Sequence, residues 1–271
     1  MKHSVSPCAP LTGHDSPSRH DPLAGRDPLS EQLKFAEHCH PTQHGILPAQ
    51  GGLYPILDAD WLATSAPTWL QADHPEHLAE RLQACAIPLV QLRCKGSGGE
   101  QYEFMARWMA ALRAKAPQVA VIVNDRVDLA LALAADGVHV GQEDLPVAVC
   151  RRLLGAHKII GLSTHSLTEI TAAATSGADY IGFGPIFPTR SKADAHTVQG
   201  IMALAAACRT STLPLVAIGG IDSKGIQSVA QAGAWAAAMI SGWFATDGST
   251  DCLEQLAAAW RHPDSINVPS S

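Results

Sequence analysis

The sequence has no apolar run that approaches the roughly 18 to 20 residues needed to span a bilayer. It also has no C-x-x-C pair, and its seven cysteines fit reduced thiols better than a disulfide framework or a zinc site. The net charge of −6 is too mild to indicate a nucleic-acid partner held by bulk electrostatics. The first residues lack the apolar segment of a secretory signal, and their acidic residues argue against a transit peptide. These absences predict a cytoplasmic protein without membrane or nucleic-acid partners.

Residues 1–50 differ from the rest of the chain in composition. They are rich in Pro, His, Ser and Asp, and contain one short helix-compatible piece over 29–39. Such a composition buries little apolar surface, so we expect a partly disordered extension. Its histidines lack regular metal-ligand spacing, which favours a solvated arm over a metal-binding one. The rest is expected to form one domain over 51–262 and a short tail over 263–271.

Short apolar runs alternate with helix-like segments from residue 51 onward. Runs of this length without polar alternation are typical of parallel strands that are buried on both faces. Eight such units predict a (β/α)₈ TIM barrel. A doubly wound open sheet would use the same units, but its G-x-G-x-x-G fingerprint after the first strand is missing. We expect helices over 126–135 and 166–176, among others, and strands over 53–57, 87–92, 119–123, 137–140, 158–162, 179–183, 213–218 and 235–240.

Polar residues gather after these strands, where the active sites of barrels form. After the second strand, Gln91, Arg93 and Lys95 are two apart and should share the inward face, with Leu92 and Cys94 on the other. Charges there are costly unless they serve a polar mouth. The two cations therefore either bind an anion or pair with carboxylates at the rim.

Carboxylates follow the next two strands. Asn124 and Asp125 end the third, and Asp144 follows the fourth. Neighbouring parallel strands lie about 4.8 Å apart, so both carboxylates can reach a common point. Two carboxylates with room for water suit Mg²⁺. Alternatively, Asp125 caps the helix that begins near Arg126, and Asp144 caps the one that begins near Pro146.

The later strands are followed by hydroxyls, cations and glycines. Ser163 either caps a helix or donates to an oxyanion, and His165 is expected to be structural. The segment GPIFPTRSKADAHTVQG (184–200) follows the sixth strand, and IGGI (218–221) and ISG (240–242) follow the last two. These glycines either close backbone N–H groups on a phosphate or serve only tight turns.

Six ordered motifs between about Leu53 and Phe244 resemble the thiamine phosphate synthase family: QLRCK, NDRVDLALALAADGVHVGQED, GLS, GPIFPTRSK, IGGI and ISG. The resemblance implies a transferase that condenses 4-amino-2-methyl-5-hydroxymethylpyrimidine diphosphate with 4-methyl-5-(2-hydroxyethyl)thiazole phosphate, or its carboxylated form. Thiamine phosphate and pyrophosphate are the implied products, Mg²⁺ is the implied cofactor, and homo-oligomers are possible. Two departures, Ser191 for a threonine and Cys94 for a glutamate, leave these expectations unchanged.

The resemblance also implies site residues. The pyrimidine diphosphate would contact Gln91, Arg93, Lys95, Asn124, Ser163 and Lys192, of which Arg93, Lys95, Ser163 and Lys192 would be catalytic. Asp125 and Asp144 would bind the metal. The thiazole phosphate would contact Thr189, Arg190, Ser191, Gly220, Ile240 and Ser241. A thiazole tautomerase of the same fold would not need this complete set, and a non-catalytic regulatory barrel would not need intact metal and cation positions.

Overall fold

A closed barrel of eight parallel strands forms the centre of the described chain. The computed structural model describes residues 47–70, 74–96, 98–189, 197–244 and 252–263. Each strand pairs with the next one along the chain, and β8 pairs with β1. The predicted TIM barrel is therefore confirmed. The strands are β1 (Leu53–Asp58), β2 (Leu89–Arg93), β3 (Ala120–Asn124), β4 (Gly137–Val140), β5 (Ile159–Thr164), β6 (Tyr180–Phe183), β7 (Leu215–Ile218) and β8 (Ala236–Met239).

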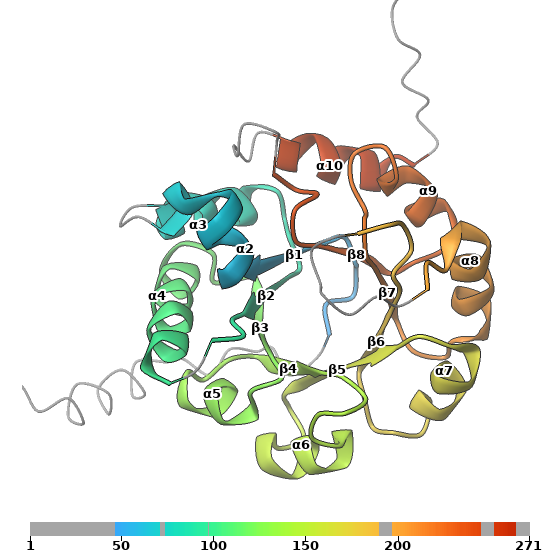
Figure 1. The fold of residues 1–271 in the computed structure, drawn as a ribbon, viewed down its shortest axis with the longest axis horizontal. Coiled ribbons are helices and arrows are strands. Elements are labelled where there is room, and N and C mark those ends of the chain that lie inside the picture. Colours follow the sequence, from blue (N-terminus) through green and yellow to red (C-terminus); the bar gives the residue numbers. More distant parts are fainter. Residues whose placement is uncertain (1–46, 71–73, 97, 190–196, 245–251, 264–271) are drawn as a thin grey trace, which may run out of the picture. The chain divides into compact units, whose positions relative to one another are not determined.

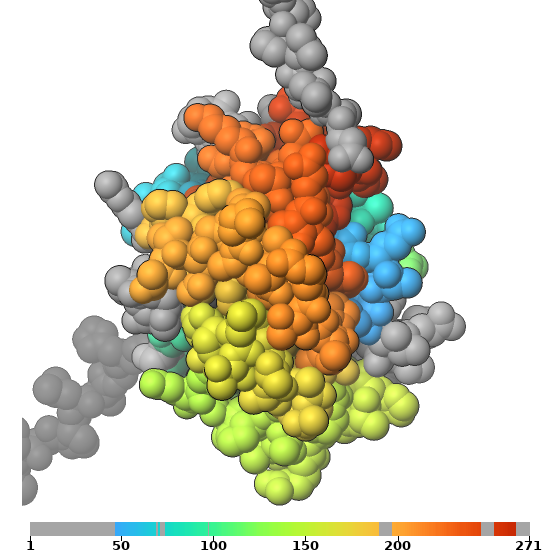
Figure 2. Space-filling view, turned by 90° about the vertical axis from the view of Figure 1, so that its right-hand side faces the viewer, coloured from blue at the N-terminus to red at the C-terminus, as the bar shows by residue number. Residues whose placement is uncertain are grey.

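Helices surround this ring of strands (Figure 1). They are α2 (Ala59–Ser65), α3 (His74–Ala84), α4 (Gly99–Lys115), α5 (Val127–Ala132), α6 (Val147–Leu154), α7 (Leu167–Ala173), α8 (Gly200–Thr210), α9 (Ile226–Gln231) and α10 (Cys252–Arg261), with a 3₁₀ helix at Pro67–Leu70. Figure 2 shows one side of the barrel, covered by the later segments in yellow, orange and red. In the part of the chain that the structure describes, no helix has the length and apolar character needed to cross a membrane.

Two of these helices are shorter than expected. The helix predicted over 126–135 spans Val127–Ala132, and Ala134 just beyond it adopts a positive φ of 51° that right-handed helix cannot continue through. The helix predicted over 166–176 spans Leu167–Ala173 and begins after Ser166, whose hydroxyl accepts a hydrogen bond from the Glu169 N–H at 3.2 Å. The predicted domain limits and most of the arm over 1–50 lie outside what the described residues test.

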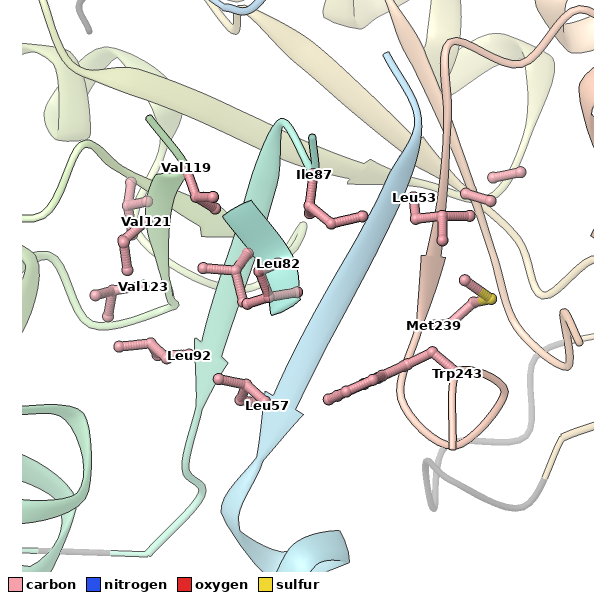
Figure 3. Packing of buried hydrophobic residues seen from close by; sticks show 14 of the residues in the cluster. Leu53, Leu57, Leu82, Ile87, Leu92, Val119, Val121, Val123, Met239 and Trp243 are labelled. Carbon is pink, nitrogen blue, oxygen red and sulfur yellow. The ribbon is translucent and has the colours of Figure 1, made fainter. Parts of the chain in front are cut away.

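Alternating strand side chains build two separate apolar clusters. Leu57 of β1, Leu92 of β2 and Val123 of β3 belong to an outer cluster between the strands and the helices, and Figure 3 shows this cluster with Leu82 of α3 packed into it. Tyr54, Ile56, Leu89, Ile122 and their counterparts on the other strands form a smaller cluster inside the ring. This period of two turns Gln91 and Arg93 toward the interior, as expected.

Candidate active site

The last residues of β1 and β2 form a buried ion pair at the carboxyl end of the barrel. Asp58 and Arg93 are Cα partners in the register, and Nη1 of Arg93 contacts Oδ2 of Asp58. Their side chains are 3% and 12% exposed. Asp58 also accepts a hydrogen bond from the Trp61 N–H at 2.9 Å through Oδ1, and so caps α2. Asp58 was not among the predicted site residues, although it directly follows the strand expected over 53–57.

Lys95 and Asp125 form a second, more exposed ion pair at the rim. Nζ of Lys95 lies 2.5 Å from Oδ2 of Asp125, and the lysine side chain is 54% exposed. The Asp125 N–H donates to the carbonyl oxygen of His139 at 2.8 Å, which fixes this residue between β3 and β4. Asp125 also has a positive φ of 61°, an uncommon conformation for a residue other than glycine. Arg93 and Lys95 thus both pair with carboxylates, as one of the two alternatives predicted. Whether they also bind an anion is not tested by these contacts.

The two carboxylates expected to hold a metal are not helix caps. The cap residues of α5 and α6 are Arg126 and Pro146, and neither helix has a side-chain cap. The cap alternative is wrong for both aspartates because the chain turns once more before each helix begins. Oδ2 of Asp144 instead accepts a hydrogen bond from the Gly141 N–H at 2.7 Å, directly after β4.

This arrangement fits a divalent cation that completes its ligands from a substrate. Asp125 directly follows β3, and Asp144 lies in the turn after the neighbouring strand β4. In the described residues, Oδ1 of neither Asp125 nor Asp144 makes a hydrogen bond. No group of three or more His, Cys, Asp or Glu residues suited to a metal ion occurs in the same residues. Mg²⁺ commonly binds through one or two carboxylates, waters and phosphate oxygens, so two carboxylates are sufficient.

A chain of hydrogen bonds crosses the barrel interior between two predicted site residues, Gln91 and Ser163. Gln91 Nε2 donates to the Tyr54 hydroxyl at 3.1 Å, and that hydroxyl lies 2.9 Å from the Tyr180 hydroxyl. The Tyr180 hydroxyl lies 3.0 Å from Nδ1 of His139, and Nε2 of His139 lies 2.9 Å from Oγ of Ser163. Ser163 therefore does not cap the next helix; Ser166 does.

The three middle residues of this chain were not predicted. Tyr54, His139 and Tyr180 stand at inward positions of β1, β4 and β6, and both tyrosines are buried. Burial raises the pKa of Tyr54 and of Tyr180 well above the ordinary phenol value. Both hydroxyls therefore keep their protons and act as hydrogen-bond donors. The sequence did contain a signal for them: each is a residue with a polar group at a position of an apolar run that alternation turns toward the barrel interior.

A cavity of about 520 Å³ is lined by α2 and by the segments that follow β6, β7 and β8. Three predicted residues, Thr189, Gly220 and Ser241, line it. Ile240 does not line it and instead packs in the inner cluster of the barrel. Trp61, Thr64 and Ser65 of α2 also line it, and none of these three was predicted. Pro188, Ile221, Asp222 and Gly242 complete the lining, and Gly242 is one of the glycines expected to surround a phosphate.

The glycine turn after β7 needs glycine for two reasons. Gly219 and Gly220 have positive φ values of 99° and 65°. A Cβ on Gly220 would lie 2.5 Å from the Pro188 carbonyl oxygen, so the turn packs directly against the segment after β6. Phe187 N–H also donates to the Gly219 carbonyl oxygen at 3.0 Å. Together these contacts hold Thr189 and Gly220 at one cavity.

Five further predicted residues have different outcomes. Asn124 ends β3, is 8% exposed and is the Cα partner of His139. His165, which was expected to be structural, lies with Nδ1 3.4 Å from Oε2 of Glu169 on α7. The loop residues Arg190, Ser191 and Lys192 lie outside the described residues, so their roles stay predictions.

The fold and this mouth define a class: a (β/α)₈ barrel with ion pairs and paired carboxylates at the ends of β1 to β4, and a glycine-lined cavity beside β7 and β8. The model of the thiamine monophosphate synthase family matches residues 61–243. A thiamine-phosphate synthase of Chlorobium phaeobacteroides is 41% identical over 191 residues, which cover 69% of this chain and 91% of that protein. The chain belongs to the thiamine monophosphate synthase family.

Two other similar proteins extend this comparison. A thiamine-phosphate synthase from a Synechococcus strain is 43% identical over 188 residues, covering 68% of this chain. The chain spans about half the length of that relative, with 52% covered. A solved structure of thiamine phosphate pyrophosphorylase from Pyrococcus furiosus superposes with a TM-score of 0.60 and 30% identity, covering 78% of this chain and 94% of the other.

Proposed function

We propose that the protein is a transferase that condenses 4-amino-2-methyl-5-hydroxymethylpyrimidine diphosphate with 4-methyl-5-(2-hydroxyethyl)thiazole phosphate, or its carboxylated form, to give thiamine phosphate and pyrophosphate. The observation that carries the proposal is that one barrel mouth has two different polar regions. One has two cations and two carboxylates at β2 to β4, and the other is a cavity with glycine turns and hydroxyls. Two phosphorylated substrates need two such regions.

The charged region suits the pyrimidine diphosphate. Arg93 and Lys95 are the cations of this region, and each forms an ion pair with a carboxylate. Lys95 is half exposed on a flexible stem, so its ammonium can turn from Asp125 to a diphosphate oxygen. Gln91 and Asn124 offer amide groups beside it, and Ser163 a hydroxyl. Lys192 is assigned to the same diphosphate through the family resemblance.

Asp125 and Asp144 would hold Mg²⁺, which commonly binds through one or two carboxylates together with phosphate oxygens. When bound there, the ion would neutralise negative charge on the departing pyrophosphate. Lys95 would then have an anionic partner other than Asp125, which agrees with its exposure. In this complex the two aspartates would bind the metal ion, and Arg93 and Lys95 would bind the diphosphate.

The cavity suits the thiazole phosphate. Backbone N–H groups in a glycine turn can surround a phosphate, and phosphate sites in barrels frequently lie after the seventh and eighth strands. Trp61 lines the same cavity and offers an aromatic surface for a flat heterocycle. The assigned residues are Thr189, Arg190, Ser191, Gly220, Ile240 and Ser241, with Ile240 acting through its backbone.

The reaction needs charge stabilisation rather than a general base. The bond between the pyrimidine methylene carbon and the diphosphate oxygen breaks, and its electron pair leaves with pyrophosphate. Arg93, Lys95 and Lys192 stabilise the negative charge that develops on that oxygen. The amino-substituted ring spreads the positive charge of the cation, and the lone pair of the thiazole nitrogen then forms the new carbon–nitrogen bond. The cavity holds this nitrogen close to the cation.

The test is a two-substrate assay with the purified full-length protein and Mg²⁺. Equal amounts of thiamine phosphate and pyrophosphate are expected, and omission of either substrate should abolish both products. Folded protein that forms neither product in the complete mixture would contradict the proposal. Turnover of the thiazole phosphate alone would indicate a tautomerase, and binding without turnover a regulatory barrel. We further infer that the protein acts in the cytoplasm, since Cys85, Cys94, Cys150 and Cys208 of the described residues form no disulfide.

A further inference from the structure

The interior hydrogen-bond chain joins five residues from five strands. Gln91, Tyr54, Tyr180, His139 and Ser163 contact one another in this order, with successive distances of 3.1, 2.9, 3.0 and 2.9 Å. Gln91 and both tyrosines are at most 4% exposed. A buried hydroxyl without a hydrogen-bond partner is costly, so each proton in this chain must find an acceptor.

The amide at one end sets the direction of the chain. Gln91 Nε2 donates to Tyr54, so the Tyr54 proton must go to another acceptor. In the described residues, the only other contact of this hydroxyl is with Tyr180, which therefore receives that proton. The Tyr180 proton then points to Nδ1 of His139. Because each phenol has a raised pKa and keeps its one proton, this direction satisfies every donor.

The direction of the chain fixes the state of the imidazole. An Nδ1 atom that accepts a proton from Tyr180 carries none itself, so a neutral ring has its proton on Nε2. Nε2–H then donates to Oγ of Ser163, 2.9 Å away. With its oxygen already accepting from the histidine, the serine directs its own proton elsewhere.

A glycine leaves the space for this geometry. A Cβ on Gly161 of β5 would lie 2.2 Å from Cζ of Tyr180 and 2.3 Å from Nδ1 of His139, so any other residue would displace the phenol or the imidazole. An apolar interior of similar volume would avoid the cost of burying these polar groups. We therefore expect the hydrogen-bond chain to have a function beyond packing the barrel interior.

We propose that His139 is a positioning residue: the hydrogen-bond chain from Gln91 through Tyr54 and Tyr180 holds it as the neutral Nε2–H tautomer, so that it orients the Ser163 hydroxyl to donate to the diphosphate of the substrate. This inference rests on the proposed function only in placing the diphosphate beside Ser163. It assigns no proton transfer to His139 and no bond to the substrate.

The tautomer is measured directly by ¹⁵N NMR of the histidine-labelled protein. His139→Gln identifies the His139 signals by their disappearance from the spectrum. A protonated Nε2 and an unprotonated Nδ1 are expected in wild type. In Tyr180→Phe, which lacks the hydroxyl that holds Nδ1, this single tautomer should give way to a mixture. A wild-type ring with a proton on Nδ1 would overturn the proposal, whatever the activity of the protein.

The coupling to Ser163 is measured by a double-mutant cycle on the affinity for inorganic pyrophosphate with Mg²⁺, using calorimetry. Tyr180→Phe should weaken binding by about three- to tenfold in wild type and leave it unchanged in Ser163→Ala. Tyr102→Phe on the outer helix α4 is the matched control and should have no effect. Equal losses in both backgrounds would show a general packing role and overturn the proposal.

Two provisions keep this result distinct from a failure of the proposed function. If Tyr180→Phe does not fold, His139→Gln takes its place in the cycle, because its amide N–H partly replaces Nε2–H and should recover part of the affinity that His139→Leu loses. Protein that shows the cycle but forms no thiamine phosphate would contradict the proposed function and support this inference. Protein that forms thiamine phosphate but shows additive effects in the double-mutant cycle would support the proposed function and contradict this inference. Wild-type protein that binds no pyrophosphate would also overturn the inference.

Discussion

Nζ of Lys95 lies 2.5 Å from Oδ2 of Asp125. The cation proposed to bind the substrate diphosphate therefore forms an ion pair with a carboxylate proposed to bind the metal. Exposed pairs of this kind contribute only about 0.2–1 kcal/mol to stability. Asp125 has a φ of 61°, and asparagine tolerates this left-handed conformation better than alanine. Asp125→Asn should therefore lower kcat/KM by about a hundredfold or more while changing the unfolding free energy by less than about 1 kcal/mol.

The matched control for this substitution is Asp128→Asn. Asp128 lies three residues further on, and its exposed carboxylate pairs with Arg126 rather than with a rim cation. Its loss should leave kcat/KM within about twofold of wild type. Steady-state kinetics and urea denaturation of both variants decide the matter. Near-wild-type turnover in Asp125→Asn would remove this residue from the site.

Lys192 is the cation assigned to the leaving pyrophosphate through the resemblance alone. Lys192→Ala should reduce kcat by about a hundredfold, because charge stabilisation at the departing oxygen is lost in the transition state. Stability should hardly change, as judged by thermal denaturation. Lys115→Ala, which breaks an exposed pair with Glu80 on the outside of the barrel, should leave kcat unaltered. Equal kinetics for the two variants would exclude the assigned role.

The barrel was predictable from the sequence because its signal is repeated eight times. Each expected strand is present within two residues of the expected limits, and the period of two correctly turned Gln91 inward and Leu92 outward. Strands that are buried on both faces occur almost only in parallel sheets covered by helices, so these runs restrict the fold to the α/β class. Helix limits were less certain, because local backbone turns such as the one at Ala134 end a helix without a change in composition.

Contacts between distant residues were not predictable in the same way. Tyr54 and Tyr180 meet only because the ring closes and the strands adopt one register, which no local pattern encodes. Asp125 resembles a helix cap in the sequence, yet its backbone conformation directs the carboxylate to Lys95. Trp61 enters the cavity from the helix after β1, a segment without any polar motif.

Trp61 should affect one substrate and not the other. Its ring lines the cavity and lies 4.7 Å from the Phe244 ring, centroid to centroid. Trp61→Ala removes an aromatic wall from the proposed thiazole site and should raise the KM for thiazole phosphate by about tenfold. Trp61→Phe should recover most of this loss, and the KM for the pyrimidine diphosphate should stay constant in both. A parallel rise in both KM values would contradict the division of the mouth into two sites.

The buried phenols predict a loss of stability in alkali. In the folded protein the pKa of Tyr180 is raised by burial, whereas an unfolded chain releases the phenol proton near the ordinary value of about 10. The buried phenol therefore contributes fully to the free energy of unfolding below about pH 10. As the pH rises further, this contribution falls by about 1.4 kcal/mol per pH unit for each phenol. Tyr180→Phe should therefore flatten the decline in urea stability between about pH 10 and 11. An unchanged slope would mean that this phenol ionises inside the folded barrel.

Gly220→Ala tests whether the glycine turn is needed for its shape or only for its backbone freedom. The substitution brings a positive φ of 65° and a Cβ 2.5 Å from the Pro188 carbonyl oxygen, so the turn and the segment before Thr189 must separate. Gly155→Ala is a matched control, because its φ is 86° and a Cβ there meets nothing within 4 Å. Both variants should lose about 1–2 kcal/mol from the left-handed backbone.

Only Gly220→Ala should go further. Displacement of the turn should cost at least about 1 kcal/mol beyond the control, and should raise the KM for thiazole phosphate by about tenfold or more, since binding geometry is sensitive to shifts of about 1 Å. Urea denaturation and steady-state kinetics of the two variants give both quantities. Identical stability losses with unaltered KM values would mean that the turn relaxes away from Pro188 without disturbing the cavity, and the assignment of the thiazole phosphate to this turn would then have to be abandoned.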